Sequence, residues 1–429
     1  MKYCTPFILI LGALLAFPNL LAAQLIPAPA QSEPIVLLGA TAHLGNGKAI
    51  ENAAVAFEDG KLTYVGPADG WNNNDQYAVL QLSGKHIYPG FIAANTQLGL
   101  IEIGAVRATR DANETGEFNP NVRSIIAYNT DSDVTPTVRS NGVLLAQATP
   151  EGGRISGTSS VVQLDAWNWE DAAYATDEGV HVQWPRRFRY RWRAGRMEEN
   201  KEYKDQVAEL EAFLKSAKAY QESAGKSGYN AKLAAMEGLF TDAKQLYVHA
   251  DDARAIQESV SLALSVSLKP VIVGGTESYL ITEFLKQHDI AVILHQTQSL
   301  PARTHRPVDE PFQTPRLLEA AGVRYCLSMD GTWELRNLPF QAGQAVGYGL
   351  EYEKAVQSIT GNAAAILGIG DRTGTLEKGK DANLFVSAGD ALDMRTCKVE
   401  QAYIQGREIN LDNKQKALYR KYQEKYSRD

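Results

Sequence analysis

Two amide side chains stand at the end of an apolar stretch early in the chain. Asn95 and Gln97 follow the apolar residues 91–94, and Gly99 opens the loop beyond them. Because side chains alternate along a strand, Asn95 and Gln97 are expected to point in the same direction. Their amide groups could hold a polar ligand or a hard cation such as calcium or magnesium. The alternative is a strand that runs into a loop with two ordinary polar residues.

The strands that must position these side chains lie between residues 87 and 329. Seven apolar stretches of strand type occur there, at residues 87–94, 142–147, 160–164, 245–249, 270–273, 291–295 and 325–329. Helical stretches separate the later ones, which favours a parallel sheet with crossover helices. A (β/α)8 barrel needs an eighth strand. Residues 180–184 are the candidate, unless the long helical region that follows distorts the ring. Chemistry in such a barrel lies at the carboxyl ends of the strands.

The stretch at residues 88–97, Tyr-Pro-Gly-Phe-Ile-Ala-Ala-Asn-Thr-Gln, resembles the first barrel strand of the amidohydrolase superfamily. Asn95 and Gln97 stand where that family has its metal-binding His-X-His pair, and Ala93 stands where an acidic residue is common. Residues 378–383 and 399–409 resemble the family's closing strands and turns. The resemblance covers residues 34–410 and is closest to imidazolonepropionase-like and secreted dipeptidase-like members.

The resemblance over residues 34–410, together with the residue patterns at both ends of the chain, predicts an α/β architecture with four parts. A signal peptide would occupy residues 1–23, and a (β/α)8 TIM-type barrel residues 89–372. The barrel would be inserted into a small composite β-sandwich of residues 34–88 and 373–410. Residues 411–429 alternate basic and acidic side chains and are predicted to form a C-terminal helix on the surface.

The resemblance also implies roles for residues near the ends of later strands. Residues 247–250, Tyr-Val-His-Ala, match the strand-five motif, so His249 would be a metal ligand. Residues 327–332 match the strand-eight motif, so Asp330 would be the catalytic acid and base. The strand-six His and the strand-four Lys of the family are missing. One zinc-type divalent ion held by His249, Asp330 and His295 is one possibility, and a protein without metal is the other. A hydrogen-bonded pocket histidine is the plain alternative for His249.

Two further residues are candidates for substrate binding beside Asn95 and Gln97. Glu277 follows the strand at residues 270–273, and Arg336 follows Asp330 closely enough to receive a substrate carboxylate at the same rim. Both assignments depend only on where the residue lies in the sequence.

Composition excludes several classes of protein. The chain has 429 residues, of which 44% are hydrophobic and 22% charged, as in globular proteins. A net charge of -7 argues against nucleic acid as a partner, because phosphate binding needs a basic surface. No zinc-finger spacing, phosphate loop or dinucleotide fingerprint occurs. A small molecule is therefore the expected ligand.

The N-terminus has the features of a secretory signal peptide. Lys2 precedes a nearly unbroken apolar run at residues 7–23, and small residues at 22–23 and 28–30 are candidate cleavage sites. The mature protein is predicted to be periplasmic or secreted, without a transmembrane segment; an uncleaved anchor is the alternative. Cys326 and Cys397 are expected to stay unbridged.

The segment at residues 186–193, Arg-Arg-Phe-Arg-Tyr-Arg-Trp-Arg, alternates arginine with aromatic residues. An extended conformation would place the two kinds on opposite faces. It could grip an acidic partner or anionic lipid. We expect instead that its aromatic side chains pack on the barrel while its arginines pair with Glu198, Glu199 and Glu202.

Two functions follow from these residues. One is a secreted amidohydrolase-family hydrolase of carbon–nitrogen bonds in a non-peptide amide, a cyclic amide or a dipeptide, with a reduced or absent metal centre. The other is a catalytically inactive binding protein of the same fold that partners a complete paralogue. A homodimer or such a heterodimer is the expected assembly, and an adaptor that acts through the arginine–aromatic segment is a third, weaker hypothesis.

Overall fold

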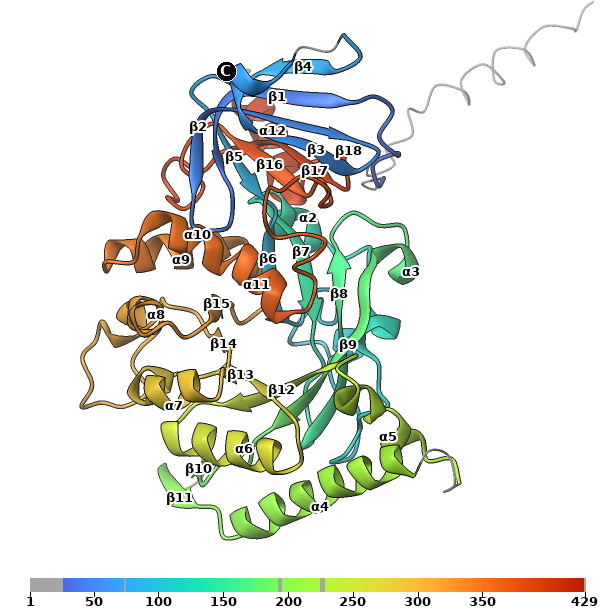
Figure 1. Ribbon diagram of the computed structural model, residues 1–429, viewed down its shortest axis with the longest axis vertical. Helices are drawn as coiled ribbons and strands as arrows, with labels where there is room; N and C mark the ends of the chain where they lie inside the picture. Colours follow the sequence, from blue (N-terminus) through green and yellow to red (C-terminus); the bar gives the residue numbers. More distant parts are fainter. Residues whose placement is uncertain (1–25, 73–74, 192–194, 224–227, 428–429) are drawn as a thin grey trace, which may run out of the picture.

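The computed structural model describes residues 26–72, 75–191, 195–223 and 228–427. A β-sheet lobe lies above a barrel, with a helical layer below (Figure 1). The predicted signal peptide lies outside the described residues. Within those ranges, no helix combines the length and the apolar character that crossing a bilayer requires.

The sheet lobe combines strands from both ends of the chain, which lie side by side in Figure 1. Strand β5 (His86–Pro89) pairs with β1 (Ile35–His43) on one side and with β16 (Leu384–Ser387) on the other. The strand order is β18-β17-β16-β5-β1-β2-β3, with β4 beside β1. The other strands are β2 (Ala49–Glu58), β3 (Lys61–Pro67), β4 (Ala78–Gln81), β17 (Val399–Ile404) and β18 (Arg407–Glu408).

The barrel is an eight-stranded sheet of order β15-β14-β13-β12-β9-β8-β7-β6. A parallel bridge between Ala94 and Ser328 brings its two edge strands together, so the sheet is nearly closed. Its strands are β6 (Phe91–Thr96), β7 (Val143–Ala148), β8 (Ile155–Gln163), β9 (Ala173–Gln183), β12 (Gln245–Ala250), β13 (Pro270–Gly274), β14 (Val292–Leu294) and β15 (Tyr325–Leu327). The predicted barrel is confirmed, and residues 180–183 of the candidate eighth strand form the end of β9.

One barrel strand runs against the others. Strand β8 is antiparallel to both β7 and β9, while the remaining neighbours are parallel. Only residues 149–154 connect β7 to β8. A parallel crossover needs a dozen or more residues, so this connection permits only an antiparallel return. The start of β8 therefore lies at the same end of the barrel as the carboxyl ends of its neighbours.

Helices cover the outside of the barrel. Helix α6 (Ala253–Ser265) buries Ala255, Ile256, Ser259, Val260 and Ala263, a one-sided pattern that packs against the sheet. The Asp252 side chain begins this helix by accepting from the N–H of Ala255. The other helices are α2 (Thr135–Arg139), α3 (Trp169–Ala172), α4 (Tyr203–Glu222), α5 (Ala231–Ala234), α7 (Thr282–Gln287), α8 (Glu310–Ala321), α9 (Leu338–Gly347), α10 (Tyr352–Ser358), α11 (Gly361–Ile366) and α12 (Lys414–Tyr426).

The barrel interior is apolar toward one end and polar toward the other. Ile92, Leu145, Tyr247 and Cys326 belong to a buried cluster that continues into α11. Cys326 and Cys397 are both free thiols. Burial raises the pKa of the Cys326 thiol, which makes it a packing residue rather than a nucleophile.

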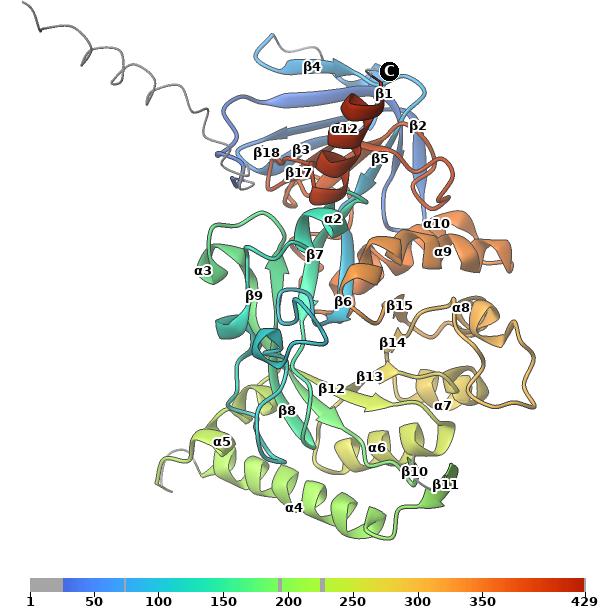
Figure 2. The same cartoon turned by 180° about the vertical axis from the view of Figure 1, so that it is seen from behind.

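Residues 113–123, part of the long connection between β6 and β7, lie over the amino-terminal part of β8. Phe118 and Arg123 form parallel bridges with Ile155 and Thr158. Figure 2 shows these loops beside β8 and β9. They cover one side of the barrel at its carboxyl end.

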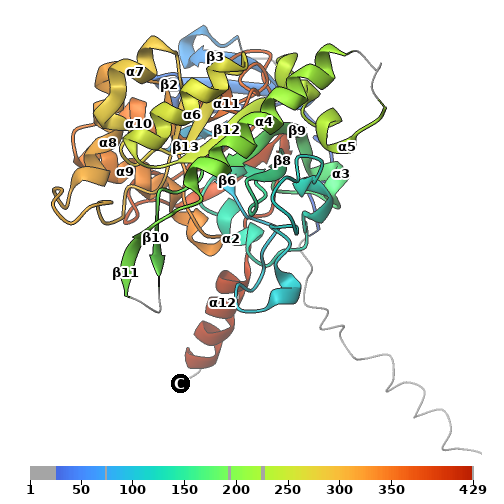
Figure 3. The same cartoon turned by 90° about the horizontal axis from the view of Figure 1, so that it is seen from below.

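The arginine–aromatic segment forms a two-stranded hairpin, β10 (Phe188–Arg191) with β11 (Arg196–Glu199), which stands away from the body (Figure 3). Arg191 pairs with Glu198, as the sequence suggested. The predicted packing on the barrel is wrong for Phe188 and Tyr190, which are 55% and 50% exposed. Trp192 and Arg193, the end of the predicted segment, lie outside the described residues. The hairpin projects from the end of β9, so its apolar face does not reach the barrel.

The C-terminal helix α12 also projects from the body (Figure 3). The Asn413 side chain caps it by accepting from the N–H of Lys416, and none of its residues is buried. It is anchored near its start, where Lys414 pairs with Asp133 and Gln415 accepts from Thr137.

Candidate active site at the barrel mouth

The mouth of the barrel is the end where β6, β7, β9 and β12–β15 finish. His249 lies near the end of β12, and His295 and Asp330 follow β14 and β15. The structure brings these three predicted residues to one place. It does not bring all of the predicted residues there, and it adds polar residues that the sequence did not single out.

His295 and Asp330 form the closest charged pair of the mouth. Nδ1 of His295 lies 3.0 Å from Oδ1 of Asp330, and Nε2 of His295 lies 3.8 Å from Oδ1 of Asp251. Burial alone would lower the pKa of His295, but the hydrogen bond to Asp330 and the charges of both carboxylates outweigh it and raise that pKa. The hydrogen bond from His295 lowers the pKa of Asp330. The pairing therefore favours the protonated form of His295 and the ionised form of Asp330.

His249 has the opposite electrostatic character. Burial, reinforced by the nearby charge of His295 and opposed by Asp330, lowers the pKa of His249 to about 3. Its Nε2 lies 2.9 Å from Nδ1 of His181, a residue that is completely buried below it. His249 is thus a neutral imidazole at ordinary pH, beside a histidine whose protonated form is favoured.

Asn95 is held at the edge of this mouth by its backbone. Its φ of +52° is a left-handed conformation that Asn tolerates better than most residues, and the register between β6 and β7 shifts there. Simple strand alternation therefore does not extend from Asn95 to Gln97, contrary to the basis of the sequence prediction. The Asn95 N–H donates to Oε1 of Gln147 at 2.8 Å, and its own Oδ1 is buried without a partner among the described residues. Gln97 is half-buried in the turn that follows.

The predicted roles of Glu277 and Arg336 are not supported by their contacts. Glu277 is 6% exposed, accepts from the N–H of Ala253 at 3.1 Å and pairs with Arg303 at 2.5 Å. Its carboxylate is therefore already bonded to the first residue of α6 and to Arg303. The Arg336 guanidinium donates to the Trp333 carbonyl, and its own carbonyl accepts from Asn141, just before β7. Among the described residues, no contact joins Arg336 to Asp330 or His295. A single sequence gives no sign of these local partners.

A polar layer lies directly below the mouth, and most of its residues were not predicted from the sequence. It consists of Gln147, Ser159, Glu178, His181 and Tyr247, which are all buried. Glu178 accepts from Gln147 at 2.7 Å, from Ser159 at 2.5 Å and from Tyr247 at 2.8 Å. Polar residues spaced along predicted strands, such as His181 between Val180 and Val182, were the available signal.

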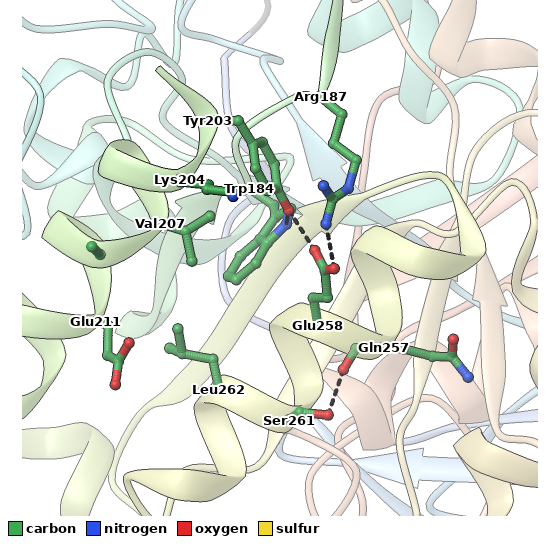
Figure 4. A pocket seen from close by; sticks show the side chains of 11 residues that line it. Trp184, Arg187, Tyr203, Lys204, Val207, Glu211, Gln257, Glu258, Ser261 and Leu262 are labelled. Atoms are coloured by element: carbon green, nitrogen blue, oxygen red, sulfur yellow. Dashed lines mark hydrogen bonds and ion pairs between the residues drawn. The ribbon is translucent and has the colours of Figure 1, made fainter. Parts of the chain in front are cut away.

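An open groove of about 510 Å³ lies beside the mouth and contains none of the predicted site residues. Figure 4 shows its centre, where Arg187 and Tyr203 converge on Glu258. The Arg187 guanidinium also lies 4.1 Å from the centre of the Tyr203 ring. These groups satisfy one another, so the groove serves to hold α4 against α6 at the base of the hairpin.

Comparison with known proteins identifies the family. The sequence pattern of the amidohydrolase family matches residues 156–409, more than half of the chain, and the chain belongs to that family. Amidohydrolase tasK from Hapsidospora irregularis is 31% identical over 115 residues, a match that covers 24% of this chain and only 12% of that longer protein.

Solved structures share the fold. An amidohydrolase from Thermotoga maritima has a TM-score of 0.76 at 24% identity, covering 88% of this chain and 99% of its own. A prolidase complexed with N-methylphosphonate-L-proline has a TM-score of 0.54 at 16% identity, with the same coverage.

The family is generally metal-dependent, but the residues at this mouth do not fit its metal centre. Within the described ranges, no group of three or more His, Cys, Asp or Glu side chains is placed to hold a metal ion. An amide, Asn95, stands at the first strand, and β13 ends in Gly274 with no imidazole. One nitrogen of His249 is already taken by His181. Amide oxygens are poor replacements for imidazole on zinc.

Proposed function

We propose that this protein hydrolyses carbon–nitrogen bonds in small polar molecules by acid–base catalysis at the barrel mouth, without a resident metal. The observation that supports it is the 3.0 Å contact between His295 and Asp330. A carboxylate whose ionised form is favoured lies beside an imidazole whose protonated form is favoured, which places a base and an acid side by side.

The proposed reaction uses the two residues in sequence. Water attacks the amide carbonyl carbon while the Asp330 carboxylate accepts its proton. The His295 imidazolium then donates a proton to the leaving nitrogen as the carbon–nitrogen bond breaks. Transfer of the proton from Asp330 to His295 restores the starting state. Without a metal to polarise the carbonyl, strained or activated amides are the favoured substrates.

The charge of the mouth suggests which substrates to test first. Asp251 and Asp330 flank His295. Glu151 lies nearby, and its pKa is raised by burial first and then by the charge of Asp330. An acidic rim suits a substrate with an ammonium group. Dipeptides are the simplest amides that carry one, and a fold relative is described as a prolidase.

The test is hydrolysis of a panel of dipeptides and cyclic amides by the purified protein, with and without a chelator. We expect chelator-resistant turnover that falls by about 10²-fold or more in Asp330→Asn, the usual contribution of a general acid–base group. Asp69→Asn, which changes an exposed carboxylate in the sheet lobe, is the matched control. Activity that chelation abolishes and zinc restores would contradict the metal-free mechanism.

A second function is favoured by one specific observation. The Asn95 backbone N–H donates to Gln147, and its side chain is an amide where the family has a metal-binding imidazole. A barrel of this kind could bind a small polar molecule without converting it, in partnership with a complete paralogue. Calorimetric binding of a panel compound with no turnover under any metal condition would favour this function over hydrolysis.

A further inference from the structure

A continuous series of hydrogen bonds runs through the barrel interior from β6 to His249. It begins at the Asn95 N–H, continues through Gln147, Ser159 and His181, and ends at the mouth. The first member is a backbone N–H, which can only donate. The direction of the whole series can therefore be derived from that end.

The Asn95 N–H fixes the orientation of the Gln147 amide. Oε1 of Gln147 accepts from it at 2.8 Å, so the Nε2 group faces the other way. Nε2 then donates to Oε1 of Glu178 at 2.7 Å and to Oγ of Ser159 at 3.1 Å. An amide side chain has only these two kinds of group, so no second arrangement satisfies the backbone N–H.

Glu178 fixes the direction of the Ser159 hydroxyl. Three donors converge on this carboxylate, from Gln147, Ser159 and Tyr247. Burial raises the pKa of Glu178, and these three hydrogen bonds oppose that shift. Oε1 accepts from the Gln147 amide, and Oε2 faces the Tyr247 hydroxyl, so a proton on this carboxyl would be held on Oε2 and Oε1 accepts in either state. The single hydroxyl proton of Ser159 is then used on Glu178, so Oγ of Ser159 must accept from the next member of the series.

The two histidines complete the series. Nε2 of His181 lies 2.9 Å from Oγ of Ser159 and must be the donor there. His181 is neutral, because burial and then His249 lower its pKa well below the usual range. Its Nδ1 is therefore an acceptor, and Nε2–H of His249 donates to it at 2.9 Å. Nδ1 of His249, which has no partner among the described residues, is left without a proton.

We propose that Gln147, Ser159 and His181 are positioning residues that hold His249 in its Nε2–H tautomer. The barrel mouth then presents an unprotonated Nδ1 to an N–H or O–H donor on the bound molecule. Beside it, His295 presents a proton and Asp330 a negative charge. The ligand class that fits is a small molecule whose donor group lies next to the carbon–nitrogen bond that His295 and Asp330 are proposed to cleave with water.

The tautomer can be observed directly by nitrogen NMR of the uniformly ¹⁵N-labelled full protein, with the ring signals assigned by His249→Gln. The expected result is a pyridine-type Nδ1 and a pyrrole-type Nε2 for His249. Ser159→Ala removes the acceptor for His181 and should convert this single state into a mixture or the opposite tautomer. Ser160→Ala is the matched control, because Ser160 is equally buried on the same strand but accepts from the Asp177 N–H.

Two results would overturn the assignment. A pyrrole-type Nδ1 in the unmodified protein would mean that Glu178 holds a proton on Oε1, donates it to Ser159, and the series runs in reverse. An unchanged His249 signal in Ser159→Ala would mean that the series does not set the tautomer. If Ser159→Ala does not fold, Ser159→Cys, with a weaker acceptor of similar size, gives the same comparison. The state of His249 is measurable whether or not hydrolysis occurs, so this failure is distinguishable from failure of the proposed function.

Discussion

Replacing Gly274 with alanine is expected to disturb the barrel mouth itself. Gly274 ends β13 with a φ of +95°, and an added β-carbon would lie 2.5 Å from Oδ1 of Asp251 and 3.0 Å from Nε2 of His295. Ordinary contact begins near 3.4 Å, so the Asp251 carboxylate would have to move by close to 1 Å. Glycine at this position therefore makes room for the acidic side of the mouth.

The expected magnitude has two parts. Backbone strain at positive φ costs about 1–2 kcal/mol for a residue with a β-carbon. Moving Asp251 also breaks the 2.9 Å hydrogen bond that it accepts from Thr276, worth about 0.5–1.5 kcal/mol. Gly368 is the matched control, because its φ is +72° and nothing lies within 4 Å of an added β-carbon. Gly368→Ala should show the strain alone.

The decisive assay is an NMR titration of the His295 ring, supported by urea unfolding. The charge of Asp251 helps to raise the pKa of His295, so that pKa should fall in Gly274→Ala and stay unchanged in Gly368→Ala. The free energy of unfolding should fall further in Gly274→Ala than in Gly368→Ala, by about the 0.5–1.5 kcal/mol that one hydrogen bond contributes. Equal stability losses in the two variants, with an unchanged pKa of His295, would refute the reasoning.

Two further predictions concern pH and export. Folding raises the pKa of His295 and lowers that of Asp330. The contribution of His295 to the stability of the fold is present below about pH 6.5 and is lost as pH rises through its folded pKa. The contribution of Asp330 is present above about pH 3.9 and is lost as pH falls through its folded pKa. The stability difference between the unmodified protein and His295→Gln should thus be largest between those values, and a pH-independent difference would contradict the pairing. We also propose export with cleavage after Ala23 rather than at the later small-residue site, because the Ala28 N–H donates to Asp165 at 2.8 Å within the fold. Sequencing the N-terminus of the periplasmic protein is expected to give residue 24, and a start at residue 31 would contradict it.

The barrel could be predicted because each strand is a short apolar run bounded by glycine, proline or polar residues. The antiparallel direction of β8 was missed although the short connection at residues 149–154 already implied it. Residues 180–184 were found as the eighth strand because Val180 and Val182 mark an apolar face. Sequence pattern thus predicted where the strands lie, and connection length carried information about direction that was not used.

The candidate site was predictable only in part. His249 and Asp330 were found by resemblance, and His295 by its place after a strand. Closure of the sheet decides that polar residues such as Ser159 and His181 face inward, and a strand pattern alone does not distinguish an interior from a solvent-facing position. The charged groups of Arg336 and Glu277 have local partners that a single sequence does not reveal.

The composite sheet has a consequence for the order in which the chain is made. Strand β5 is synthesised long before β16, its neighbour in the sheet, with 294 residues between Pro89 and Leu384. At a translation rate of about 5–20 residues per second, one edge of β5 waits on the order of 15–60 seconds for its partner. An open strand edge is a site for wrong pairing during that interval. The early strands must therefore be kept apart from other chains until the last tenth of the protein has emerged.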